Sequence, residues 1–230
     1  MGRIYTVANQ KGGVGKTTTS INLAAYLGHF GQKVLLVELD PQANATICLG
    51  IDRHKVESGT YEVLIGAKNP LDCVLHNERF KLSLMPSSPN LSGAEIELIE
   101  LSDRERRLRN TLQSLISRYD YILIDCPPSL GLLTLNGMMA AQDGVIIPVQ
   151  SEYLALEGLS QLTQTLTRIR QGLFPELAIR GVLLTMFDGR TNLSTDVMSE
   201  VQKFFQDKVF STFIPRSIRL AEAPSFGMPI

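Results

Sequence analysis

Residues 9–18, which read NQKGGVGKTT, constrain the fold of this chain more than any other feature. They follow a short apolar run over residues 4–8 and precede a helical pattern over residues 16–30. The glycines allow a tight turn whose backbone N–H groups point inward, and a helix N-terminus adds the positive end of a dipole. The segment therefore predicts a buried strand, a phosphate-binding loop and a helix, in that order.

Short apolar runs alternate with helical patterns along the rest of the chain. The predicted strands are residues 4–8, 33–39, 82–86, 121–125, 145–149, 182–186 and 209–214. The predicted helices are residues 16–30, 103–118, 130–141, 156–172 and 193–205. Most of the apolar runs lack polar alternation, which is typical of parallel strands buried on both faces. The sequence thus predicts an α/β fold with a doubly wound, mostly parallel sheet flanked by helices, and residues 50–80 as a surface excursion.

Composition narrows the functional classes. The chain has 22 Lys and Arg against 23 Asp and Glu, a net charge of -1 that excludes a globally basic nucleic-acid binder but not a local basic patch. No apolar run approaches the ~18 residues that cross a bilayer. The three cysteines, Cys48, Cys73 and Cys126, form no C-x-x-C pair, which gives a zinc site or disulfide framework little support and suits a reducing cytoplasm.

The loop carries two lysines. Lys16 is expected to reach the β- and γ-phosphates of a nucleotide, and the Thr17 hydroxyl is expected to bind Mg²⁺. The usual G-x-x-x-x-G-K-[ST] pattern is not met, because Gln10 stands where its first glycine would fall. A dinucleotide-binding G-x-G-x-x-G pattern fails as well, at Thr18. A second lysine, Lys11, instead begins the run KGGVGKT.

Two aspartates follow predicted strands, where open α/β sheets bind their ligands. Asp125 follows three aliphatic residues and has the Walker B pattern, so it is expected to hold Thr17 or a Mg²⁺-bound water. Asp40 follows residues 33–39 and precedes Pro41. As an alternative, Asp40 serves as the N-cap of the segment that follows it in the chain.

Residues 11–18 resemble the deviant Walker A motif of the ParA/MinD group of P-loop ATPases. The resemblance implies that ATP or ADP, with Mg²⁺, is bound by Lys11, Gly12, Gly13, Val14, Gly15, Lys16, Thr17 and Thr18. It also implies that Lys11 reaches across an ATP-bound sandwich dimer to the partner's phosphates, which would tie dimerisation to the triphosphate. By the same resemblance Asp40 positions or activates the attacking water, while Glu38 stands where the family often has Asp. Lys11, Lys16 and Asp40 are thus the expected catalytic residues.

Two later segments, residues 187–193 and 215–225, resemble the chromosomal ParA, or Soj-like, branch in particular. The resemblance puts Glu152 against the ribose across the dimer, and the adenine beside Met186, Pro215 and Ser217. A helix-start acid remains an alternative for Glu152, and core filling remains one for Met186. The resemblance further implies one ATPase domain over residues 1–230, ending short of the family's usual last helix.

The resemblance implies a cytoplasmic, nucleoid-associated ATPase that drives chromosome or plasmid segregation. Its hydrolysis would be weak alone and stimulated by a ParB-type partner, and its ATP-dependent homodimer would bind non-specific double-stranded DNA rather than a membrane. DNA contacts are expected from Arg190, Arg216 and Arg219, three arginines in segments predicted to be non-helical. As an alternative, Arg216 serves the nucleotide or pairs with Glu222.

Three other functions are compatible with the fold. A membrane-positioning ATPase of the MinD kind carries a basic amphipathic C-terminal helix, which this sequence does not show. An iron–sulfur electron carrier needs a cysteine pair near the dimer axis, and here only Cys126 lies beside a nucleotide motif. A small-molecule ligase would turn over without DNA or a protein activator.

Overall fold

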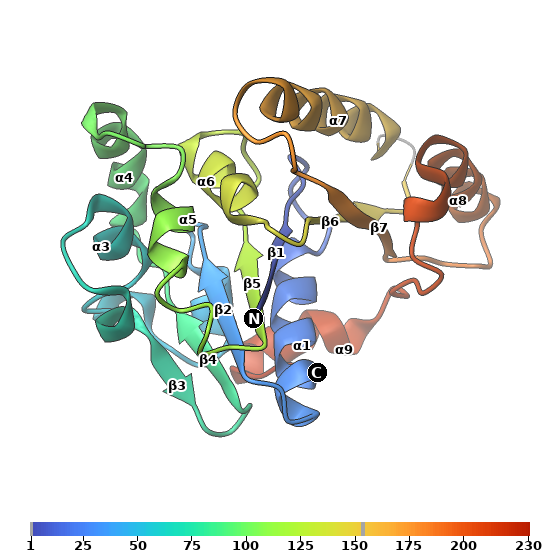
Figure 1. Cartoon of the computed structure of the whole chain (residues 1–230). Helices are drawn as coiled ribbons and strands as arrows, with labels where there is room; N and C mark the ends of the chain where they lie inside the picture. Colours follow the sequence, from blue (N-terminus) through green and yellow to red (C-terminus); the bar gives the residue numbers. More distant parts are fainter. Residues whose placement is uncertain (1, 153–154) are drawn as a thin grey trace.

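A computed structural model of the chain describes residues 2–152 and 155–230 (Figure 1). Its centre is a seven-stranded sheet in the order β3-β4-β2-β5-β1-β6-β7. The strands are β1 (Arg3–Val7), β2 (Val34–Glu38), β3 (Leu75–Asn77), β4 (Leu82–Met85), β5 (Tyr121–Asp125), β6 (Val145–Gln150) and β7 (Ile179–Thr185). Every neighbouring pair is parallel except β3 and β4, so the predicted mostly parallel sheet is confirmed.

Helices cover both faces of the sheet (Figure 1). They are α1 (Lys16–His29), α2 (Asn44–Cys48), α3 (Thr60–Ile65), α4 (Leu91–Glu97), α5 (Arg107–Leu112), α6 (Leu132–Ala140), α7 (Ala155–Gly172), α8 (Asn192–Phe205) and α9 (Ile218–Glu222). Short 3₁₀ turns lie at Arg53–Lys55, Pro70–Cys73, Leu98–Glu100, Gln206–Lys208 and Ala223–Phe226. Helix α1 packs on β1, β2 and β5, while α6 packs on β1 beside α5.

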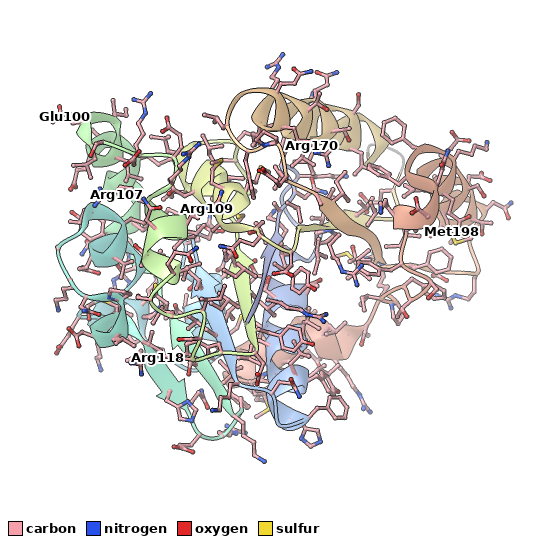
Figure 2. All side chains as sticks on the ribbon, in the orientation of Figure 1. Glu100, Arg107, Arg109, Arg118, Arg170 and Met198 are labelled. Atoms are coloured by element: carbon pink, nitrogen blue, oxygen red, sulfur yellow. The ribbon has the colours of Figure 1, made fainter. Side chains whose placement is uncertain are left out.

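Two arginines contact the segment that follows α7. Figure 2 labels both of them, Arg109 on α5 and Arg170 on α7. The Arg109 guanidinium lies 4.5 Å from the centre of the Phe174 ring, and Arg170 Nε donates to Leu177 O at 2.6 Å. These arginines thus serve internal packing through cation–π and carbonyl contacts.

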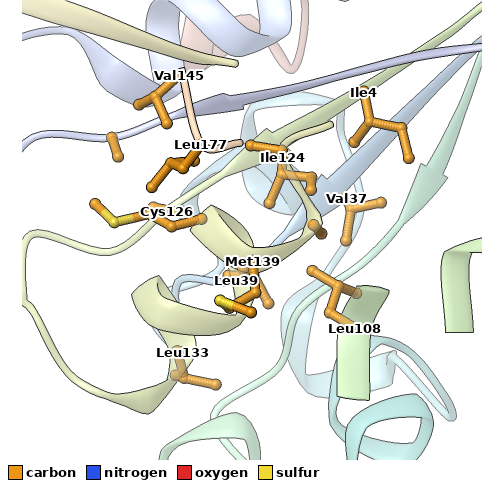
Figure 3. Packing of buried hydrophobic residues seen from close by; sticks show 14 of the residues in the cluster. Ile4, Val37, Leu39, Leu108, Ile124, Cys126, Leu133, Met139, Val145 and Leu177 are labelled. Carbon is orange, nitrogen blue, oxygen red and sulfur yellow. The ribbon is translucent and has the colours of Figure 1, made fainter. Parts of the chain in front are cut away.

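Alternate residues of the strands point to opposite faces, which gives the sheet two cores. Ile4, Val37 and Ile124 belong to one buried cluster with Met139 of α6 (Figure 3). The residues next to them face α1 in a second cluster, which includes Tyr5, Leu36 and Leu123. Burial on both faces explains why the strands read as unbroken apolar runs.

Residues 209–214 do not form the predicted strand. Phe210 N–H donates to Val182 O at 3.0 Å and Ile214 N–H donates to Leu184 O at 2.8 Å, so the segment advances four residues while β7 advances two. Residues 211–213 therefore bulge out and are exposed. Only isolated bridges to the sheet remain, at Val209 and Pro215.

The helix predicted over residues 103–118 is limited to α5. Asn136 of α6 fixes the turn before this helix, since its Oδ1 accepts from Leu108 N–H at 3.1 Å and its Nδ2 donates to Arg104 O at 2.7 Å. Asp103 has a φ of 53°, which no helix continues through. Residues 50–80 were predicted as a surface excursion, yet they contain α3 and β3 and bury Leu64 and Cys73.

Candidate nucleotide-binding site

The loop between β1 and α1 has the conformation that an anion-binding turn needs. Gly13 and Gly15 have φ angles of 74° and 86°, which side-chain-bearing residues rarely adopt. Thr185 Oγ1 donates to Val14 O at 2.8 Å and Asn9 Nδ2 donates to Pro148 O at 2.7 Å, so the loop is fixed to the ends of β6 and β7. Helix α1 begins without a side-chain N-cap, which leaves its first N–H groups for an anion.

Lys16 is a buried cation at the start of α1, with 6% of its surface exposed. Its Nζ donates to Lys11 O at 3.0 Å. Burial lowers the pKa of Lys16, while the charges of Asp125 and Asp40 raise it. A buried ammonium is stable only with anionic partners, so a phosphate group fits this position.

Asp125 ends β5 and is fully buried. Ser20 Oγ donates to its Oδ1 at 3.0 Å, whereas Oδ2 has no hydrogen-bond partner within residues 2–152 and 155–230. Burial raises the pKa of Asp125 to about 6, although the hydroxyls of Thr17 and Ser20 lower it. An orphaned carboxylate oxygen beside a threonine hydroxyl is the donor set that Mg²⁺ prefers, so Thr17 and Asp125 fit a magnesium ion.

Asp40 and Glu38 have different roles at the end of β2. Asp40 is buried, and its Oδ1 accepts from Gln42 N–H at 2.9 Å. It is not the N-cap of α2, because that position belongs to Ala43. Glu38 instead accepts hydrogen bonds from the first turn of α2. Burial raises the pKa of Glu38, whereas the hydrogen bonds from Thr46 and Ala45 lower it and favour the ionised carboxylate.

The ammonium group of Lys11 pairs with an acidic side chain. Its Nζ lies 3.5 Å from Glu152 Oε2, and Arg216 Nη2 lies 3.9 Å from Glu152 Oε1. All three side chains are partly exposed. Glu152 thus joins the loop lysine to one of the arginines that we expected at DNA, and Arg216 pairs with it rather than with Glu222. Tyr153 and Leu154, which follow Glu152 in the segment resembling the family, lie outside the described residues.

An apolar groove of about 510 Å³ opens beside the first turns of α1. Thr18 and Pro215, two of the predicted nucleotide residues, line it with Leu220. Met186 follows β7 in the left-handed region, with a φ of 50°, and is half-buried. Ser217 is half-buried at the position before α9. The groove brings together two of these residues, and Met186 and Ser217 lie on the segments leading to it.

The three predicted DNA-binding arginines are exposed. Arg190 makes a bidentate pair with Asp188, with Nε–Oδ1 at 2.8 Å and Nη2–Oδ2 at 2.7 Å. The hydrogen bonds from Arg190 lower the pKa of Asp188 to about 2, and the charge of Arg216 contributes to this lowering. Arg219 lies on α9, so its predicted place in a non-helical segment is wrong. Arg190 and Arg216 therefore flank one carboxylate, and Arg219 lies on the next helix.

Comparison with known proteins decides the family. Residues 2–179 match the family described as AAA domain. The chain is 53% identical to the sporulation initiation inhibitor protein Soj of Bacillus subtilis (strain 168), over all of this chain and 90% of that protein. It is 52% identical to the chromosome partitioning protein ParA of Myxococcus xanthus (strain DK1622), over all of this chain and 81% of that protein.

This chain belongs to the ParA/MinD family, in its Soj-like branch. Among solved structures, it resembles a cobyrinic acid a,c-diamide synthase from Mycobacterium smegmatis with bound ADP and magnesium. That likeness has 40% identity and a TM-score of 0.90 over 99% of this chain and 93% of the other. The septum site-determining protein MinD from Pyrococcus horikoshii, with Mg-ADP, gives 28% identity and a TM-score of 0.78 over 100% and 87%.

Two features of this ParA-family site escaped the sequence analysis. Ser20 holds Asp125, and Thr185 holds the loop at Val14. Ser20 lies one turn after Lys16, on the face of α1 that also buries Ile21 and Ala24. A hydroxyl beside these apolar residues was the sequence signal that could have revealed its role. Thr185 ends a strand in the same way as Asp125, but threonine is common in strands and gives no signal by itself.

Proposed function

We propose that this Soj-like protein is a DNA-segregation ATPase. It binds Mg-ATP, forms a sandwich dimer, binds double-stranded DNA without sequence preference, and hydrolyses ATP weakly until a ParB-type protein stimulates it. Relatives named for chromosome partitioning, which are about half identical over the whole of this chain, support this assignment. We further propose that residues 1–230 act as one ATPase domain.

Side chains of the loop and of two strand ends contact different parts of the nucleotide in this proposal. Lys16 neutralises the β- and γ-phosphates, and Thr17 and Asp125 hold Mg²⁺, which supplies positive charge to the phosphate oxygens. The apolar groove at Thr18 and Pro215 suits the flat faces of a purine. Asp40 orients the attacking water, because its carboxylate is held at the carboxyl edge of the sheet near Lys16.

The side-chain position of Lys11 supports the proposed dimer. Its ammonium is not used by its own loop, since only its backbone oxygen contacts Lys16 and its Nζ pairs with Glu152 at a partly exposed position. An exposed ion pair is weak and easily exchanged. A second protomer's triphosphate, with several negative charges, is therefore a stronger partner for Lys11 than Glu152.

Sizing chromatography with ATP tests the dimer. Wild type should elute as a dimer with ATP and as a monomer with ADP. Lys11→Ala should bind ATP with near-normal affinity but stay monomeric, whereas Lys16→Ala should lose ATP binding. If Lys11→Ala dimerises normally, the lysine does not act across the interface and this assignment is wrong.

The ligase alternative has a specific observation in its favour, the structural likeness to a protein named as a cobyrinic acid a,c-diamide synthase. A ligase would hydrolyse or transfer ATP only with its small-molecule substrate, and DNA would not change the rate. The MinD-like alternative has the weaker likeness. No helix in the described part of the chain has the length and apolar character to cross a bilayer.

A further inference from the structure

Glu38 ends β2 as an entirely buried acid. Its register partner on the neighbouring strand is Asp125, so two carboxylates lie side by side at the carboxyl edge of the sheet. A buried carboxylate is costly unless hydrogen bonds compensate it. The hydrogen bonds of Glu38 therefore indicate its structural role.

Three donors of α2 converge on the Glu38 carboxylate. Oε1 accepts from Ala45 N–H at 2.6 Å, and Oε2 accepts from Thr46 N–H at 3.0 Å and from the Thr46 hydroxyl at 2.5 Å. Ala45 and Thr46 lie in the first helical turn, where backbone donors have no partner inside the helix. Ala43, at the N-cap position, has no side-chain acceptor. Glu38 thus caps α2 from the end of the preceding strand.

The cap closes a short segment, residues 39–44, that contains Asp40. Leu39 N–H donates to Asp125 O at 2.9 Å at one end, and Ala43 N–H donates to Asp40 O at 2.9 Å within the turn. Ala43 has a φ of 54°, a strained conformation for alanine that needs support from its surroundings. Because Glu38 holds the far end of this turn at α2, it determines where the Asp40 backbone lies.

A second strand end joins the same network. Ser87 N–H, in the segment after β4, donates to the Thr46 hydroxyl at 3.2 Å. The hydroxyl therefore receives a hydrogen bond from one side and donates one to Glu38 on the other. Loss of the Thr46 hydroxyl would leave the Ser87 N–H and a Glu38 oxygen each short of a partner.

We propose that Glu38 is a positioning residue for ATP hydrolysis, which clamps the first turn of α2 and thereby holds the Asp40 carboxylate in its working place. This inference rests on the proposed role of Asp40 at the attacking water. Glu38 touches neither nucleotide nor water in this account. Its effect should therefore fall on kcat and pass through Asp40, because small displacements of an orienting group cost rate rather than binding.

The test compares Glu38→Gln with wild type in ATP affinity and in kcat. Either orientation of the new amide sets its NH₂ group against a backbone N–H of Ala45 or Thr46, so the clamp is lost with little change in volume. We expect kcat to fall about 10- to 100-fold, as for a group misplaced by about 1 Å, while the Kd for a fluorescent ATP analogue stays within about twofold. Thr46→Val should act in the same direction, and Thr46→Ser, which keeps the hydroxyl, should recover most of the rate.

A double-mutant comparison separates positioning from general damage. If Glu38 acts through Asp40, Glu38→Gln should lower kcat no further in an Asp40→Ala background. Val201→Ala, a buried truncation in α8 on the far side of the sheet, is the control for lost stability and should lower Tm without lowering kcat. A normal kcat in Glu38→Gln, or an equal loss in the presence and absence of Asp40, overturns the clamp. A normal kcat in Asp40→Ala instead overturns the assigned role of Asp40.

Discussion

Buried charge sets the chemistry of individual residues at the carboxyl edge of the sheet. Lys16, Glu38 and Asp125 are all largely excluded from water, and each has a pKa displaced toward its neutral form by burial. Their hydrogen-bond partners show which of them has an atom left over for a ligand. Glu38 has a full set of donors, whereas Asp125 keeps one oxygen without a partner in the described part of the chain.

The binding of Mg-nucleotide should weaken below about pH 6. The pKa of Asp125 is raised to about 6, and the carboxyl must lose its proton before it can bind a dication. Affinity should therefore fall by up to about tenfold for each pH unit below that pKa. Calorimetric titrations with Mg-ADP between pH 5 and 8 measure this slope. Asp125→Asn should bind weakly with no such slope between pH 5 and 6, and an equal slope in both proteins would exclude Asp125 as its source.

Asp188→Asn should tighten DNA binding. Asp188 neutralises Arg190 through a bidentate pair, and DNA phosphates must compete with it. Release of one arginine per protomer adds about two phosphate contacts per dimer and should steepen the log–log salt slope by about 2. Fluorescence anisotropy with a labelled duplex gives both values. Asp196→Asn, which removes the same charge from an exposed position on α8, should leave the slope unchanged, and weaker DNA binding by Asp188→Asn would mean that Asp188 orients Arg190 instead.

At the scale of elements, the sequence was most informative where one physical signal dominated. The loop after β1 and the long helices α1 and α7 were predicted nearly to the residue, because glycine conformation and helical periodicity are local properties. The short α2 was not predicted, since its N-terminus is stabilised by Glu38 from another element. The register break at residues 211–213 was equally invisible, because it depends on how the segment meets β7.

The candidate site divides in the same way. Lys16 and Asp125 were found because a loop motif and a strand end mark them in the sequence. The pairing of Lys11 and Arg216 through Glu152 could not be predicted, because these residues come from three segments that only the tertiary fold brings together. The same holds for Asp188, whose role depends on the rotamer of Arg190.

Gly12→Val should give a nucleotide-binding monomer. A Cβ at Gly12 would meet only Pro128 Cβ, at 4.0 Å, and Gly12 is not in the left-handed region, so the protomer accepts a side chain there. In the proposed dimer this position faces the partner, where a β-branched side chain would collide. Gly13→Val is the matched control, because a φ of 74° should make valine strain the loop and abolish nucleotide binding. An ATP-dependent Gly12→Val dimer would remove this position from the interface.

The whole molecule is nearly neutral, with a net charge of -1, so the proposed DNA binding must depend on a local patch that the proposed dimerisation doubles. Arg109 and Arg170 serve internal packing instead, since they contact Phe174 and Leu177 after the end of α7. Arg190, Arg216 and Arg219 are exposed, and Arg216 is linked to Lys11 of the nucleotide loop through Glu152. A patch beside the loop gives a physical reason for coupling between ATP and DNA.

Glu replacements at both Arg190 and Arg219 should abolish DNA binding and leave ATP-dependent dimerisation intact. Each protomer loses two positive charges and gains two negative ones at the patch, so phosphates are repelled while the nucleotide loop is untouched. The control is Arg79→Glu with Arg118→Glu, which makes the same charge change at exposed positions before β4 and β5, at the opposite edge of the sheet. Equal loss of DNA binding in both double variants would show an effect of net charge alone.

The central claim, that ATP converts this protein into a sequence-blind DNA binder, is tested most directly by anisotropy over a salt series. Two unrelated duplexes are titrated with protein in the presence of ATP, of ADP and of no nucleotide. The account predicts binding with ATP alone, equal for both duplexes, with a log–log salt slope of about -4 to -5 from four to six phosphate contacts. Binding that is the same in all three nucleotide conditions, or absent with ATP, would contradict it.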